Sequence, residues 1–181
     1  MQAGTGGFIN PQKVIDQLDL RPDMKVADFG CGHAYFTVPV SKAVGKDGKV
    51  YAVDVLPEAL EAVRSRAQLE GLANIETIRG NLELPAGSGL AEDFVDLVLL
   101  HNVLFQSQKK AEIIKEAKRV LKMGGIFILI DWRKEILAIG AQGGWRISLD
   151  EAKALAQEEG FVFNKSFDAG EFHYGLMFIK P

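Results

Sequence analysis

The sequence predicts an α/β protein built on a doubly wound, mostly parallel sheet, with helices on both faces and an antiparallel hairpin at its C-terminal end. Two patterns lead to this prediction. Short apolar segments alternate with segments of helical periodicity, and parallel strands need crossover helices of this kind. Near the C-terminus, the apolar segments 161–167 and 171–179 are separated only by Asp168-Ala169-Gly170, which is typical of a hairpin turn. With the hairpin included, seven strands are expected.

Length and composition predict one domain over residues 1–181. Of the 181 residues, 48% are hydrophobic and 25% charged, which is ordinary for a globular protein with a single core. No apolar run reaches the roughly 18 residues that cross a membrane. The first residues lack the pattern of a secretory signal, and the single cysteine, Cys31, has no partner for an internal disulfide. We therefore expect a cytoplasmic protein.

The charge of the chain argues against a nucleic-acid partner. The formal net charge is −3, whereas nucleic-acid binding usually requires a basic surface. The densest basic segment lies within 109–122, where Glu112 and Glu116 are interleaved with the lysines. A solvated helix face is the better interpretation of that segment. The oligomeric state is left open.

The N-terminal half alternates helices and strands. Asn10-Pro11 suits a helix start, because Asn caps helices and Pro fits the first helical position, and the apolar spacing continues to Leu20. Pro39 lies inside the second helical pattern, where we expect a kink. The expected strands are 25–29, 49–55 and 74–79, and the expected helices are 10–20, the segment around 36–44, and 57–70.

The C-terminal half continues the alternation. Residues 94–100 form a nearly continuous apolar run, which indicates a buried central strand. Ser148 and Glu151 have the spacing of a capping box, which predicts the start of the last helix. The expected elements are a loop at 84–93, a helix over 109–122 that ends at Met123-Gly124-Gly125, a strand over 126–130 and a helix over 148–159.

A glycine turn follows the first strand, within residues 26–36. Gly30 and Gly32 can take backbone angles that other residues avoid, and they let a ligand lie directly against the main chain. The pattern favours a nucleotide site, but tight strand-to-helix turns also use glycine for purely structural reasons. Both interpretations stay open on this segment alone.

Polar residues follow the apolar core of each expected parallel strand. The carboxyl ends of parallel strands meet at one edge of the sheet, where such folds bind ligands at the point of strand-order reversal. The residues expected at this edge are Asp28, Asp54, Asn81, His101 and Asp131. The sequence therefore predicts a ligand site there.

This order of features resembles the class I S-adenosylmethionine-dependent methyltransferases, in their small-molecule or quinone-type branch, over about residues 10–181. The segments that carry the resemblance are Asp28-Phe29-Gly30-Cys31-Gly32, Val53-Asp54-Val55, Gly80-Asn81, 96–104, 121–126 and the final hairpin. The resemblance implies a Rossmann-like fold and S-adenosylmethionine as methyl donor, with S-adenosylhomocysteine as product. It also implies methyl transfer to a small-molecule acceptor, whose identity stays open.

The resemblance also implies which residues bind the donor. Asp54 would accept hydrogen bonds from both ribose hydroxyls, Val55 would pack on the adenine, and Asn81 would bond its amino group. Asp28 and Asp54 keep the simpler alternative of capping a helix or a turn. In two departures from the family, Ala34 replaces a frequent third glycine and Asn81 a common Asp. The expected donor-binding residues are Asp28, Gly30, Gly32, Asp54, Val55, Asn81, Leu82 and His101.

Two residues are catalytic candidates. Methyl transfer is an in-line displacement that needs alignment above all, so a base is required only if the acceptor must lose a proton. His101 is the first candidate, since an ordinary histidine pKa of about 6.5 suits proton transfer; a histidine hydrogen-bonded at a strand end is the alternative. Asp131, with Trp132 beside it, occupies the equivalent position after the fifth strand.

Other residues have weaker predictions. Tyr35 and Phe8 would either shape the donor cavity or pack in the core. The lead, 1–9, is an expected flexible lid, and 132–147 is an expected substrate loop. No metal site is predicted, because Cys31 and His33 have no second cysteine to complete one.

Two other functions compete with this prediction. Because no obligatory catalytic residue can be named, a non-catalytic partner or regulatory protein that binds S-adenosylmethionine is one alternative. An NAD-dependent oxidoreductase is the other. There Tyr35 would stand where the dinucleotide fingerprint needs Gly or Ala, and no second domain is left for a substrate.

Overall fold

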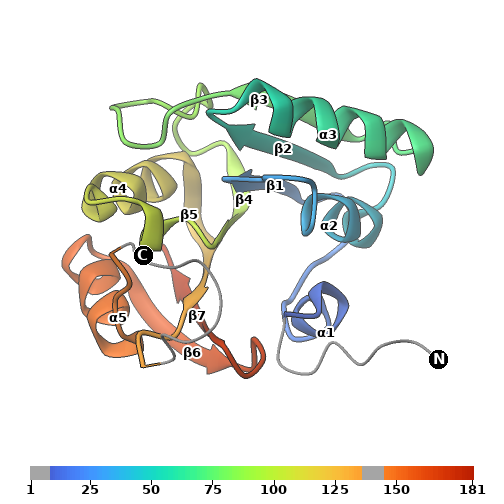
Figure 1. Cartoon of the computed structure of the whole chain (residues 1–181). Helices are drawn as coiled ribbons and strands as arrows, with labels where there is room; N and C mark the ends of the chain where they lie inside the picture. The colour runs from blue at the N-terminus through green and yellow to red at the C-terminus, as the bar shows by residue number, and fades with distance from the viewer. Residues whose placement is uncertain (1–8, 136–144) are drawn as a thin grey trace.

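A seven-stranded sheet organises the chain in the computed structural model, which describes residues 9–135 and 145–181 (Figure 1). Its order is β3-β2-β1-β4-β5-β7-β6. The strands are β1 (Lys25–Phe29), β2 (Lys49–Asp54), β3 (Ile75–Arg79), β4 (Val95–His101), β5 (Leu121–Trp132), β6 (Val162–Phe167) and β7 (His173–Ile179). Strands β1 to β5 pair in parallel, and β7 lies antiparallel between β5 and β6. The predicted sheet and its hairpin are confirmed.

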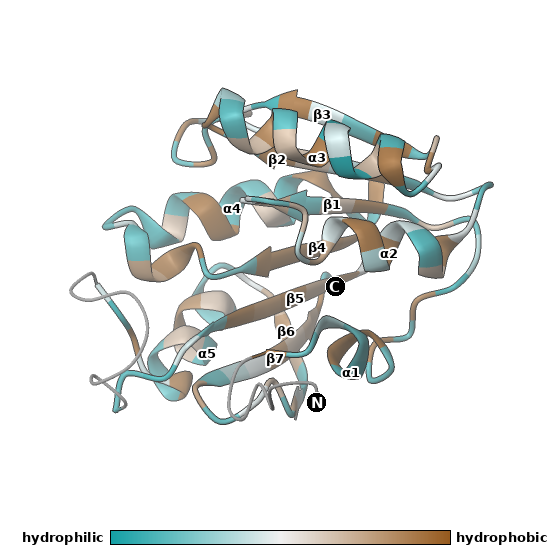
Figure 2. Cartoon of the chain, turned by 45° about the vertical axis from the view of Figure 1, so that its right-hand side comes forward, coloured by the Kyte–Doolittle hydropathy of each residue, from teal (hydrophilic) through white to brown (hydrophobic). Residues whose placement is uncertain are grey.

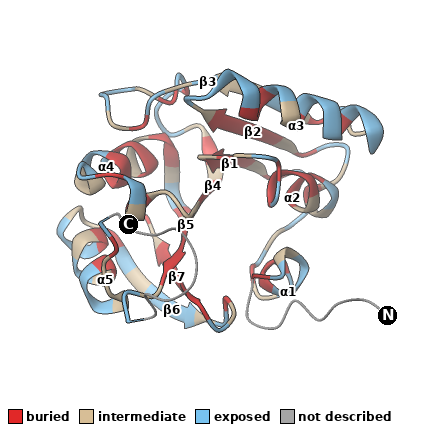
Figure 3. Ribbon diagram, in the orientation of Figure 1, coloured by how far each residue is buried: buried red, intermediate tan, exposed pale blue. Residues whose placement is uncertain are grey.

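Helices cover both faces of this sheet. The helices are α1 (Pro11–Ile15), α2 (Thr37–Val44), α3 (Pro57–Leu69), the short 3-10 helix η1 (Leu104–Gln106), α4 (Lys110–Val120) and α5 (Leu149–Glu158). Apolar side chains of α4 and α5 pack on one face, and those of α1, α2 and α3 pack on the other. The central strands are therefore apolar and buried on both sides, as Figures 2 and 3 show.

Two helix starts are capped as the sequence predicts. The Asn10 side chain accepts a hydrogen bond from the backbone N–H of Lys13 at 3.2 Å. Ser148 and Glu151 form a reciprocal capping box at the start of α5. Each cap satisfies N–H groups that the first helical turn leaves unpaired.

The first two helices differ from the prediction. Helix α1 ends at Ile15 rather than near Leu20, because the N–H groups of Gln17 and Leu18 bond three residues back and tighten the chain into a turn. Pro39 lies in the first turn of α2, where its missing N–H would have no intrahelical acceptor. The predicted kink is therefore not required there.

Strand β5 begins earlier than predicted. Helix α4 ends at Val120, and Leu121 already pairs with Val95 of β4. The glycines after it do not end the helix. Instead, the N–H of Gly124 and the C=O of Gly125 both bond Lys180, just beyond β7. This tertiary pairing extends the strand through a segment that looks like a helix stop.

The order of the strands fixes the place of the site. Strand β1 pairs with β2 on one side and with β4 on the other. From β1 the chain continues to β2 and β3 on one side, and it then returns to β4 on the other side of β1. The loops that follow β1 and β4 therefore run in opposite directions from the carboxyl ends of these two strands. A crevice is expected at this point.

Candidate functional site

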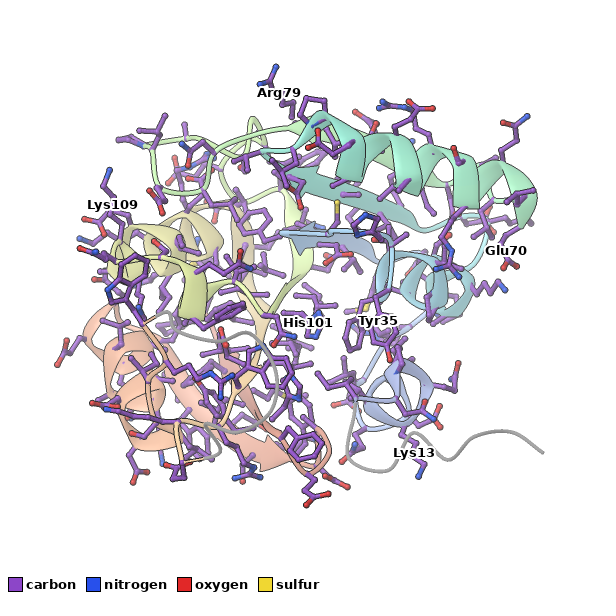
Figure 4. All side chains as sticks on the ribbon, viewed as in Figure 1. Lys13, Tyr35, Glu70, Arg79, His101 and Lys109 are labelled. Carbon is purple, nitrogen blue, oxygen red and sulfur yellow. The ribbon has the colours of Figure 1, made fainter. Side chains whose placement is uncertain are left out.

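A cavity of about 700 Å³ opens at the carboxyl ends of β1, β2 and β4. Its size is typical of a small-molecule site. Seven of the eight predicted donor-binding residues line it: Gly30, Gly32, Asp54, Val55, Asn81, Leu82 and His101. Asp28 and Asp131 are not part of its wall. Figure 4 places His101 and Tyr35 beside each other at one side of the sheet edge.

The glycine turn presents its main chain to this cavity. Gly30 and Gly32 have φ angles of 72° and 50°, in the left-handed region that favours glycine. The N–H groups of Gly30 and Cys31 bond the carbonyl of Val53, which fixes the turn against β2. A Cβ added at Gly32 would meet no atom within 4 Å. The turn is thus held firmly and leaves open space beside Gly32.

Ala34, which replaces the frequent third glycine, also takes a left-handed conformation. Its φ is 64°, and its side chain is buried against Val38 and Leu60. The backbone of the turn therefore keeps a geometry that suits glycine although the side chain has changed.

Asp54 lies at the end of β2 and supports the turn. Its Oδ2 accepts a hydrogen bond from the N–H of Gly32 at 3.0 Å, and its Oδ1 accepts one from the N–H of Leu56 at 3.0 Å. A carboxylate has about four acceptor positions, so two remain for a ligand. The capping role and the expected ribose role are compatible in the same side chain.

Asp28 lies beneath the turn rather than in the cavity wall. It is 1% exposed, and its Oδ2 accepts a hydrogen bond from the hydroxyl of Thr37 at 2.5 Å. Burial raises its pKa from 3.8 to about 6, with the hydrogen bond from Thr37 opposing that shift and the Asp54 charge adding to it. Asp28 thus anchors the start of α2 to β1, which is the simpler of its two predicted roles.

The loop after β3 closes the far side of the cavity. Asn81 accepts a hydrogen bond from the N–H of Glu83 at 3.0 Å, and the hydroxyl of Ser107 donates one to Glu83 at 2.6 Å. Behind the loop, the buried Glu116 accepts a hydrogen bond from the N–H of Ser88. These hydrogen bonds therefore hold the loop that carries Asn81 and Leu82 in place.

His101 is the last residue of β4 and forms the cavity wall towards β5. Its ring stacks on Tyr35, with centroids 6.1 Å apart, and meets the edge of Phe36 at 4.7 Å. Burial, with a smaller contribution from His173, lowers its pKa to about 3. At neutral pH the ring is uncharged and weakly basic, so it is better suited to hydrogen bonding than to taking a proton.

Asp131 is 2% exposed and holds the backbone beside the site. Its carboxylate accepts hydrogen bonds from the N–H groups of Phe105 at 3.2 Å and Trp132 at 2.7 Å. Burial raises its pKa to about 6, and these backbone bonds and the charge of Lys110 oppose the shift. The structure therefore places it under η1, away from the cavity.

Further wall residues were not predicted from the sequence. They come mainly from the segment after β4 and from the loop after β3: Cys31, His33, Leu56, Ala59, Gly80, Glu83, Asn102, Val103, Gln106, Ser107 and Ile113. Tyr35 also lines the cavity and is 46% exposed, so it does not pack in the core. Phe8 and most of the expected substrate loop lie outside the described residues.

The cavity wall carries negative charge. Its wall contains the carboxylates of Asp54 and Glu83, and no Lys or Arg lines it among the described residues. The same residues contain no cluster of His, Cys, Asp or Glu that could hold a metal ion, and no helix among them is long and apolar enough to span a bilayer.

Known proteins are similar to this chain in sequence and in fold. Residues 20–142 match the family described as a methyltransferase domain. A demethylmenaquinone methyltransferase of Bacillus mycoides (strain KBAB4) is 31% identical over 151 residues, which are 83% of this chain and 60% of that protein. Another, of Geobacillus stearothermophilus, is 29% identical over 119 residues, 65% of this chain and 49% of that one. The chain thus spans about half to three fifths of the length of these relatives.

A solved structure agrees with these matches. The crystal structure of a SAM dependent methyltransferase from Aquifex aeolicus aligns with a TM-score of 0.86 and 26% identity, covering 96% of this chain and 91% of that chain. The chain belongs to the methyltransferase domain family, and its fold and cofactor class are those of the class I S-adenosylmethionine-dependent methyltransferases.

Proposed function

We propose that this protein transfers the methyl group of S-adenosylmethionine to a small-molecule acceptor of the quinone type. The observation that carries the proposal is the cavity at the strand-order reversal, with the open glycine turn at its floor and two carboxylates, Asp54 and Glu83, in its wall. A donor with a sulfonium and an ammonium group suits these negative charges. The pyrophosphate of NAD would meet the same carboxylates with no Lys or Arg from the described wall.

The residues present fit such a donor. Gly32 leaves its backbone open, Asp54 has free acceptor positions, and Val55 offers an apolar side chain that is 47% exposed. Asn81 can reach the edge of an adenine from the neighbouring loop. When bound, the donor supplies an already activated methyl group.

The chain's own task is then alignment and the exclusion of water. Positioning of this kind contributes up to roughly 7–11 kcal/mol to lowering a barrier. The aromatic rings of Tyr35 and His101 form the wall next to β5, where a planar acceptor can pack. The names of the relatives, demethylmenaquinone methyltransferases, support a quinone-type acceptor for this chain as well.

Calorimetry and a labelling assay test this function. We expect S-adenosylmethionine and S-adenosylhomocysteine to bind, NAD not to bind, and a methyl-tritiated donor to label a naphthoquinol added with the enzyme. Binding of NAD alone would overturn the proposal. Tight donor binding without transfer across a broad panel of acceptors would instead favour a non-catalytic partner or regulatory protein.

A further inference from the structure

A second group of ring side chains lies beyond His101, towards β5 and β7. In the strand register His101 is opposite Ile130, and Trp132 is opposite His173. Side chains alternate between the two faces of a strand. His101, Trp132 and His173 therefore lie on one face of the sheet, the face that α1 and α2 cover.

These side chains form an aromatic cluster. The Trp132 and His173 rings are in contact, with centroids 4.0 Å apart, and the guanidinium carbon of Arg146 lies 5.1 Å from the Trp132 ring. On the other side, Tyr35 stacks on His101 at an interplanar angle of 23°. Four chain segments distant in sequence thus contribute flat rings to one place.

The two imidazoles in this aromatic cluster carry buried polar atoms without hydrogen-bond partners among the described residues. These atoms are Nε2 of His101 and both ring nitrogens of His173, which pair with nothing among the described residues. His173 is only 2% exposed. Leaving a buried polar group unpaired costs stability, and the large majority of buried side-chain polar atoms are paired in known structures. A fold that bears this cost at two neighbouring rings indicates a ligand.

The spacing of this imidazole pair, His101 and His173, indicates what kind of group fits. Their ring centroids are 6.3 Å apart. A direct N–H···N bond of about 2.9 Å would bring the centroids to roughly 5 Å. The longer spacing excludes a direct bond between the two rings, and one oxygen at about 2.8 Å from a nitrogen of each ring would span it.

The protonation state of the pair narrows the choice further. Burial lowers the pKa of both rings, to about 3 for His101 and, with the charges of Arg146 and Arg133, to about 4 for His173. Each neutral imidazole has one N–H donor and one acceptor nitrogen. An oxygen that can both donate and accept, which is a hydroxyl, satisfies one ring in each direction.

We propose that the imidazole pair binds a hydroxyl group of an aromatic acceptor whose ring packs against Tyr35 and Trp132. This proposal rests on the proposed function, since it assigns the chemistry of the acceptor at the place where the methyl group is transferred. It adds His173 and Trp132, which the cavity wall does not include, to the residues that select the acceptor.

Histidine NMR tests the contact directly. The chain has three histidines, His33, His101 and His173, so ring-labelled protein gives three assignable signals. We expect 1-naphthol, added to the S-adenosylhomocysteine complex, to shift the His101 and His173 signals together. 1-Methoxynaphthalene, which lacks the donor hydrogen, should bind at least tenfold more weakly. Equal binding of the two probes, or shifts confined to His33, would overturn the proposal.

Matched variants on β7 separate binding from folding. His173→Phe keeps a ring but no polar atom, and we expect it to weaken 1-naphthol binding at least tenfold while the S-adenosylhomocysteine affinity stays within twofold. Tyr174→Phe is the control, because Tyr174 is the adjacent residue, lies on the opposite face and also carries a buried hydroxyl without a partner among the described residues. It should leave both affinities unchanged. His173→Leu, which also removes both ring nitrogens, repeats the test if the Phe variant folds poorly.

The outcomes distinguish this proposal from the proposed function. If the wild-type protein does not bind S-adenosylhomocysteine, the proposed function itself is contradicted. Normal S-adenosylhomocysteine binding with no response of His173 to 1-naphthol, or an unchanged naphthol affinity in His173→Phe, would contradict only the role of the imidazole pair.

Discussion

The two ends of the candidate site treat their polar groups in opposite ways. At the donor end, formed by Gly32, Asp54 and Asn81, each functional oxygen already bonds the protein's own backbone. At the imidazole pair, the buried nitrogens have no partner among the described residues. The donor end is held in place before a ligand arrives and keeps free acceptor positions for it, whereas the imidazole pair needs a ligand to satisfy its nitrogens.

This difference indicates how the two ends recognise their ligands. A donor end held by its own backbone bonds keeps its shape and loses little entropy on binding, which suits a donor that must be bound for any acceptor. Unpaired imidazoles reject a ligand that lacks the matching hydrogen-bond group, because the desolvation cost then stays uncompensated. The preformed shape of the donor end favours binding of the donor, and hydrogen-bond matching at the imidazole pair selects the acceptor.

The largest expected effect concerns the shape of the donor end. Gly30→Ala would place a Cβ 2.4 Å from Cγ2 of Val103 at a φ of 72°. Overpacking and backbone strain together should lower the free energy of unfolding by about 4 kcal/mol, as measured by urea denaturation. Gly32→Ala is the control: with no atom within 4 Å, it should cost only about 1 kcal/mol of stability. Equal losses in the two variants would mean that packing does not fix the turn.

The buried acid under that turn gives the next effect. Because the pKa of Asp28 is raised from 3.8 to about 6, the folded state binds its proton more tightly than the unfolded state. Its contribution to stability therefore falls as pH rises from about 4 to 6 and is constant above that. Asp28→Asn, which cannot ionise, should exceed the wild type by up to about 3 kcal/mol at pH 7.5.

Urea denaturation between pH 4 and 8 checks this result. The advantage of Asp28→Asn should nearly vanish near pH 4, where the wild-type carboxyl is protonated in the folded state and already about half protonated in the unfolded state. Asp131, whose pKa is raised to about 6 as well, is present in both proteins, so its contribution cancels. An advantage of the same size at every pH would show that Asp28 does not titrate as described.

These residues also mark what could be predicted from sequence. Gly30, Gly32 and Asp54 follow apolar strands in a local pattern, and strand ends meet at one edge of any parallel sheet, so the donor end could be predicted. Asp131 also ends a strand, but its carboxylate turns to the backbone of η1, which no local pattern reveals. His173 could not be found, because its place beside His101 depends on the register of β7 against β5.

A smaller effect is expected from the ribose side of the donor end. Asp54→Ala removes two acceptors of backbone N–H bonds and the predicted partner of the ribose hydroxyls. We expect S-adenosylhomocysteine to bind more weakly by about 1–3 kcal/mol, roughly 5- to 150-fold, in calorimetry. His173→Phe, at the other end, should not change this affinity. An unchanged affinity in Asp54→Ala would mean that other residues hold the ribose.

The smallest effect compares neighbouring residues of β7. Tyr174→Phe removes a buried hydroxyl that has no partner among the described residues, so the folded state should gain about 1 kcal/mol in urea denaturation. His173→Phe should also stabilise the protein, since it removes two unpaired nitrogens. If His173→Phe instead lowers stability, the imidazole supports the fold. If both variants gain stability and only His173→Phe loses 1-naphthol binding, the unpaired nitrogens are kept at the expense of stability because the acceptor needs them.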